Sequence, residues 1–160
     1  MVKYKNLLYP DKIKNEDILN NLNIYLNYLF NKGINRVYRL DLFSGEIWGT
    51  DLGNGVFDIL LYYIDKGLRF DDIIIPSNCS FCNNKKYLNF VEYYIGEFKT
   101  RNIRIQFSAS IDGPVLDNIN RPLKNNSTSK NENFYKNIYD FIAKYDYGFH
   151  PMISPENIEY

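Results

Sequence analysis

The segment from Leu42 to Trp48 (LFSGEIW) combines an exposed backbone with one carboxylate. It follows an alternating β-rich run, so Ser44, Gly45 and Glu46 are expected at the carboxyl end of a strand. In parallel α/β folds, ligands bind at that end of the sheet. The backbone around Gly45 and the carboxylate of Glu46 can together hold an ammonium group. Taken alone, the segment also fits an ordinary turn, because Ser-Gly-Glu occurs in many turns.

A second polar run, Ser108 to Pro114 (SASIDGP), follows a later β-rich segment. Ser110 and Asp112 offer a hydroxyl and a carboxylate on the polar face of that strand. The next loop carries three further polar residues: Asp117, Asn120 and Arg121. An arginine entering from this loop can pair with a ligand carboxylate through two parallel hydrogen bonds. Asp-Gly-Pro is also ordinary turn chemistry, so this run by itself leaves both interpretations open.

Cys79 and Cys82 form a CxxC sequence after another β-rich run. A structural zinc needs four ligands, and the only other soft ligand in the chain is His150, so no metal ligand is predicted. A thioredoxin-like redox motif is expected at a helix N-terminus in a different βαβ context. Packed or incidental thiols are therefore the favoured interpretation, with redox or metal chemistry as the alternative. The lone His150 is more often structural.

Apolar residues at helical spacing predict four helices. The first covers about 15–32, with Asn15 as its N-cap and Gly33 as its end. Its apolar stripe consists of Ile18, Leu22, Tyr25 and Leu29. The other helices are expected at about 54–66, through Leu88 to Phe98, and through Phe134 to Tyr145. Four β-rich runs lie between and after them, at 36–43, 72–75, 103–111 and 148–153.

This alternation predicts an α/β fold with a parallel sheet and right-handed crossovers. A doubly wound sheet is apolar on both faces, whereas here Arg104, Gln106 and Ser108 alternate with apolar residues. A polar row fits a concave lumen that holds a polar ligand, as in a partial barrel whose helices cover only the outside. The alternative is an edge strand with one wet face.

Composition limits the class of protein. The 160 residues suit one domain, 1–160, with 45% hydrophobic residues and 19 basic against 19 acidic side chains. This balance argues against disorder and against nucleic-acid binding driven by bulk charge. No run approaches a membrane span and the first residues do not form a signal peptide, so a cytoplasmic protein is expected. The sequence also lacks Walker, GxGxxG, HExxH and GxSxG motifs.

Together, in this order and spacing, the two strand-end motifs resemble the radical SAM superfamily, most closely the sulfatase-maturating or SPASM branch. The resemblance implies that Glu46, with the backbone of Ser44 and Gly45, holds the amino group of S-adenosylmethionine (SAM). Ser110 and Arg121 would contact its carboxylate end. Two more positions are added to the SAM site, Asn78 at the next strand end and Asp112.

The defining feature of this family is a CxxxCxxC loop whose three thiolates hold a 4Fe-4S cluster. This chain has only two cysteines, Cys79 and Cys82, and they follow a later strand than the family's loop does, so the chain would not ligate the cluster. We therefore expect an internal portion of the family core, strands two to five of a partial (β/α)6 TIM-like barrel that is incomplete at both ends. An intact relative would generate a 5'-deoxyadenosyl radical to modify a peptide or protein side chain. Whether this chain belongs to an enzyme stays open, since a non-catalytic ligand- or protein-binding module derived from the fold is the alternative. The sequence does not reveal the oligomeric state.

Overall fold

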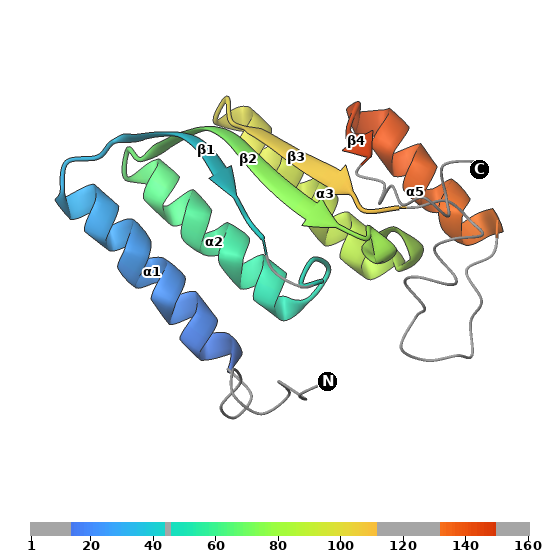
Figure 1. Ribbon diagram of the computed structural model, residues 1–160, viewed down its shortest axis with the longest axis horizontal. Helices are drawn as coiled ribbons and strands as arrows, with labels where there is room; N and C mark the ends of the chain where they lie inside the picture. Colours follow the sequence, from blue (N-terminus) through green and yellow to red (C-terminus); the bar gives the residue numbers. More distant parts are fainter. Residues whose placement is uncertain (1–13, 44–45, 112–131, 150–160) are drawn as a thin grey trace, which may run out of the picture.

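Helices and strands alternate along the chain (Figure 1). The computed structural model describes residues 14–43, 46–111 and 132–149. The helices are α1 (Asn15–Asn31), α2 (Asp51–Asp65), α3 (Lys85–Thr100) and α5 (Glu132–Tyr145), with a short 3-10 helix η2 (Ser80–Asn83) before α3. The strands are β1 (Arg36–Asp41), β2 (Arg69–Ser77), β3 (Arg104–Ala109) and β4 (Gly148–Phe149). The predicted order of elements is therefore confirmed.

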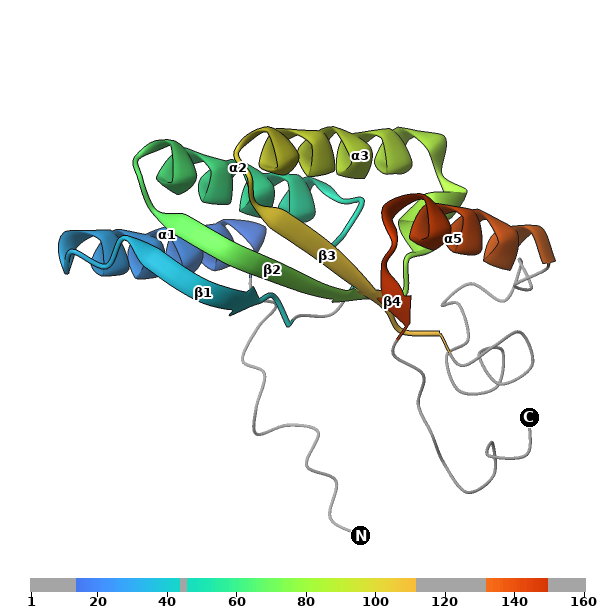
Figure 2. The same ribbon diagram turned by 90° about the horizontal axis from the view of Figure 1, so that it is seen from above.

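The strands form one parallel sheet in the order β1-β2-β3-β4. Asp41 aligns with Ile74 across the first pair, and Ser77 aligns with Ala109 across the second, so the strand ends meet at one edge. The described helices all lie on one side of the sheet (Figure 2). The protein is thus an α/β fold of alternating βα units, with the one-sided helix layer expected for part of a barrel.

Strand β3 has the two faces that the sequence predicted. Ile105 and Phe107 are buried under the helices, whereas Arg104 is exposed and Gln106 is half-buried on the opposite face. This polar face also carries an ion pair between Arg104 and Asp72 of β2. Strand β4 pairs only with Ser108 and Ala109, so among the described residues Arg104 and Gln106 have β2 as their one strand neighbour, and the edge-strand explanation of the polar row stays open.

The core fills the space between the sheet and its helices with aromatic and branched side chains. Phe107, at the centre, is fully buried and lies against the rings of Phe81 and Phe141, with centroids 5.3 and 5.8 Å away. Trp48 follows β1 and contacts Phe107 edge to face at 6.0 Å. These contacts tie the loops at the carboxyl end of the sheet to the helix layer.

Helix ends follow local capping chemistry with two differences from expectation. Asn15 is the first residue of α1 rather than its cap, because the Asp17 carboxylate accepts the backbone N–H of Lys14 at 3.3 Å. Helix α2 begins at Asp51, three residues before its predicted start, because the Thr50 hydroxyl accepts the N–H of Gly53. Gly33 ends α1 as predicted, with a positive φ of 73° that suits glycine.

The buried face of α1 differs from the predicted stripe. Leu26 is fully buried and Leu22 is partly buried, but Ile18 and Tyr25 are 37% and 53% exposed. Helix α1 packs on α2, so the apolar residues on its other flank stay uncovered by the described residues. None of the described helices is long and apolar enough to cross a membrane.

Candidate functional site

Three predicted site residues meet at the carboxyl end of the sheet. Glu46 lies in the loop after β1, Asn78 directly follows β2, and Ser110 directly follows β3. The other four predicted positions lie outside the described residues: Ser44, Gly45, Asp112 and Arg121. The candidate site therefore consists of these three residues and of the groups that join them.

The Glu46 carboxylate bridges from the first βα unit to the end of β2. It accepts hydrogen bonds from the Ser77 hydroxyl at 3.0 and 3.2 Å and from the Asn78 backbone N–H at 2.7 Å. The Trp48 backbone N–H also donates to it. A carboxylate has about four acceptor positions, so these three donors leave room for one more. Glu46 as a whole residue is exposed, while its carboxyl group is partly removed from water.

The Glu46 loop is held in place by contacts with helix α2. Trp48 is buried against Phe57, with ring centroids 5.0 Å apart. Gly53, in the first turn of α2, lies so close to the loop that a Cβ there would come within 2.7 Å of the Ile47 carbonyl oxygen. Glycine is thus required for this approach. Together these contacts fix the backbone that carries the Glu46 side chain.

Ser77 is the residue that joins the site together. Its buried hydroxyl donates to Glu46 and accepts the backbone N–H of Cys79 at 2.9 Å, while its carbonyl accepts the N–H of Ser110 at 2.7 Å. The sequence placed Ser77 beside Asn78 but assigned it no site role. The available signal was a hydroxyl at the end of the apolar run Ile73–Ile75, directly before the polar Asn78.

The electrostatics of the site centre on Glu46. Partial burial raises the pKa of its carboxyl above the ordinary glutamate value, because removal of water disfavours the charged form. The hydrogen bonds from Asn78, Ser77 and Trp48 act in the opposite direction and stabilise the carboxylate. A carboxylate that is partly stripped of water gains more from an ammonium partner than one in bulk solvent does.

The CxxC cysteines lie behind this site and not in it. Both thiols are buried and free. Burial raises the pKa of Cys79 to about 12 and raises the pKa of Cys82 further. Neutral buried thiols neither attack disulfides nor ligate metals readily, which favours the interpretation as packed thiols. Within residues 14–43, 46–111 and 132–149, no three His, Cys, Asp or Glu side chains are grouped as metal ligands. His150 lies outside these ranges.

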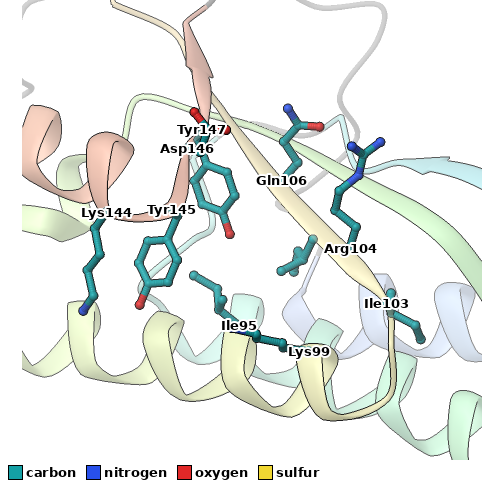
Figure 3. Close-up of a pocket in the computed structure, with 10 residues that line it drawn as sticks. Ile95, Lys99, Ile103, Arg104, Gln106, Lys144, Tyr145, Asp146 and Tyr147 are labelled. Atoms are coloured by element: carbon teal, nitrogen blue, oxygen red, sulfur yellow. The ribbon is translucent and has the colours of Figure 1, made fainter.

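A separate cavity of about 380 Å³ lies beside the amino-terminal half of β3 (Figure 3). Tyr145 and Tyr147, at the end of α5, border it opposite Ile95 of α3. Two of its cations are already paired, Lys144 with Glu92 at 2.7 Å and Arg104 with Asp72. The sequence did not predict this cavity, and it is lined by none of the predicted site residues.

Comparisons with protein-family models, with curated proteins and with solved structures gave no match to this chain. The likeness to the radical SAM superfamily therefore depends on the motifs themselves. Of those motifs, the described part of the chain contains Glu46, Asn78 and Ser110, which lie at one edge of a parallel sheet.

Proposed function

We propose that this chain binds SAM at the carboxyl end of its sheet, as the cofactor-binding portion of a radical SAM core. The observation that carries the proposal is the Glu46 carboxylate, which is held by Ser77 and Asn78 and has one acceptor position left. The amino group of SAM would donate to that position. The open polar face of the sheet supports the proposal, since a bound polar ligand needs such a surface.

The residues of this chain do not fit a 4Fe-4S cluster. The sequence has two cysteines, and both are buried thiols with raised pKa values. The proposal for the chain therefore concerns SAM binding alone. Radical formation, and hydrogen abstraction from a peptide or protein side chain, would require cysteines that this sequence does not contain.

The two buried cysteines favour a second candidate, a ligand- or protein-binding module that keeps the old pocket without radical chemistry. Both candidates predict the same result in a turnover assay, whereas the SAM titration described below tests the first candidate alone. Anaerobic reconstitution with iron and sulfide, followed by an assay for 5'-deoxyadenosine, should give no turnover for this chain. Robust turnover would contradict both the cysteine argument and the module.

SAM binding is best tested by calorimetric titration with a pair of ligands. SAM carries an amino group that Glu46 would hold, whereas 5'-methylthioadenosine lacks the amino acid end. We expect SAM to bind saturably and Glu46→Gln to weaken it by about tenfold to a hundredfold, the range for a lost charged hydrogen bond of roughly 1.5–3 kcal/mol. Binding of methylthioadenosine should not change on Glu46→Gln.

Glu97→Gln is the matched control for this titration. Glu97 lies in the last turns of α3, which precedes the amino end of β3, and pairs there with Arg101 at 3.0 Å. The same chemical change at this opposite edge should leave SAM binding unaltered. Absence of saturable SAM binding, or equal weakening in the two variants, would overturn the proposal.

A further inference from the structure

The cavity beside β3 is bordered by α3, β3 and the chain that leads from α5 into β4 (Figure 3). Strands β3 and β4 pair at Ser108 with Gly148 and at Ala109 with Phe149. Before these pairs, residues 144–147 lie across the cavity from β3. Because the two strands are already joined, no further strand of a barrel can enter between them. The volume of about 380 Å³ is in the range of small-molecule sites.

The amino half of β3 turns buried backbone groups toward this cavity. The N–H of Ser110 donates to the Ser77 carbonyl at 2.7 Å, so the backbone of Ser110 faces β2. Backbone groups of successive strand residues point to opposite sides, and Ile105 therefore directs its N–H and C=O away from β2. Ile105 lines the cavity and is only 4% exposed. Within the part of the chain that the structure describes, neither group has a strand neighbour or a backbone partner on that side.

These two backbone groups call for a polar occupant. Buried N–H and C=O groups are almost always paired with protein, water or a ligand. The N–H and C=O of one extended residue point to the same side, so Ile105 presents a donor next to an acceptor. A complementary ligand carries an acceptor and a donor side by side in one plane, as the edges of nucleobases do. A further peptide strand would need a longer open edge, since β4 closes this one at Ser108.

The side walls of the cavity favour a flat ring. Tyr145 and Tyr147 stack on each other, with centroids 5.5 Å apart and ring planes 18° apart. Tyr147 is also held by the buried ring of Phe107 at 6.0 Å. Ile95 of α3 lies on the opposite side of the cavity (Figure 3). Aromatic side chains bind nucleobases by stacking, so this wall and the Ile105 backbone suit the same kind of ligand.

The charge of the lining favours an anion. Three cationic side chains line the cavity, Lys99, Arg104 and Lys144, against one carboxylate, Asp146. Arg104 and Lys144 each have an acidic partner. Lys99, near the carboxyl end of α3, forms no ion pair with any described residue, which leaves its ammonium group for a ligand. A lysine ammonium is a common partner of phosphate in proteins.

We propose that this cavity binds a mononucleotide. The edge of the base pairs with the backbone N–H and C=O of Ile105, its ring lies against Tyr147, and its phosphate is held by Lys99. None of the residues of the proposed SAM site lines the cavity, so this site is separate from that one and does not depend on it.

The test is calorimetric titration of the full chain with UMP and with AMP. We expect at least one of them to bind saturably, with one molecule per chain. Lys99→Met should weaken that binding by about tenfold or more, because a charge-assisted hydrogen bond to the phosphate is lost. Lys85→Met, at the other end of α3, is the matched control and should leave the affinity unchanged. Lys99→Met should also leave SAM binding unchanged, so failure of one proposal is separable from failure of the other.

Modified ligands test the two ends of the nucleotide separately. The nucleoside without phosphate should bind equally to wild type and to Lys99→Met. A methyl group that removes the donor of the base edge, as in 3-methyl-UMP or N6,N6-dimethyl-AMP, should weaken binding by about tenfold, since the Ile105 carbonyl then loses its partner. Absence of saturable binding of both UMP and AMP would overturn the proposal. Unchanged affinity in Lys99→Met, or equal affinity for the methylated and parent nucleotides, would overturn it as well.

Discussion

Phe107 should be among the most sensitive positions in the chain, because it joins the sheet to the helix layer. Its fully buried ring contacts Trp48, Phe81 and Phe141 at centroid distances of 5.3–6.0 Å. Replacing a buried phenylalanine by alanine lowers the free energy of unfolding by about 3–5 kcal/mol, from lost transfer energy and the cavity left behind. For a domain of this size, each kcal/mol corresponds to roughly 2–4 °C in Tm. Phe107→Ala should therefore lower Tm by roughly 6–20 °C.

The same substitution at Phe43 is the control, since that side chain is 75% exposed. Phe43→Ala should change the free energy of unfolding by no more than about 0.5 kcal/mol. Thermal unfolding followed by circular dichroism measures both variants. Equal effects in the two, or a Phe107→Ala loss below about 1 kcal/mol, would show that Phe107 does not join the layers in the way described.

Three further perturbations address the site. Burial raises the pKa of Glu46, so the native state loses stability as the pH rises and the carboxyl ionises. Glu46→Gln removes this loss because glutamine does not ionise. The difference in Tm between Glu46→Gln and wild type should therefore shift in favour of the variant from about pH 4 to about pH 7. Ser77→Ala should lower the free energy of unfolding by about 1–3 kcal/mol in urea titrations, because the buried Cys79 N–H loses its acceptor. Cys79 and Cys82 should react with a thiol reagent only after denaturation; rapid modification of the native chain would contradict their burial.

Patterns within single elements predicted the fold. The alternation of Ile105 and Phe107 with Arg104 and Gln106 gave both faces of β3 correctly, because a strand's period of two is local information. The outer flank of α1 was predicted less well. Ile18 and Tyr25 have the spacing of a buried stripe, but burial depends on which neighbours a helix meets, and α1 packs on α2 along another flank.

The candidate site was predicted only in its parts. Glu46 was recognised at a strand end because turn residues follow the β-rich run, whereas Asn78 was added only from the resemblance to the radical SAM superfamily. Their contact was not recognised, since it depends on the parallel alignment of β1 with β2 and on the buried hydroxyl of Ser77. A serine at a strand end has no sequence signature that distinguishes a connecting hydroxyl from one in an ordinary turn.

The bond from the Asn78 N–H to Glu46 joins residues that are 32 positions apart and belong to different βα units. Such a contact forms only after the β1 unit docks on β2, so it has the cost of closing a long loop. The Asn78 amide is therefore a natural probe of folding order. Its hydrogen exchange should slow when the first two units assemble, and Glu46→Gln should speed that exchange while central β3 amides stay protected.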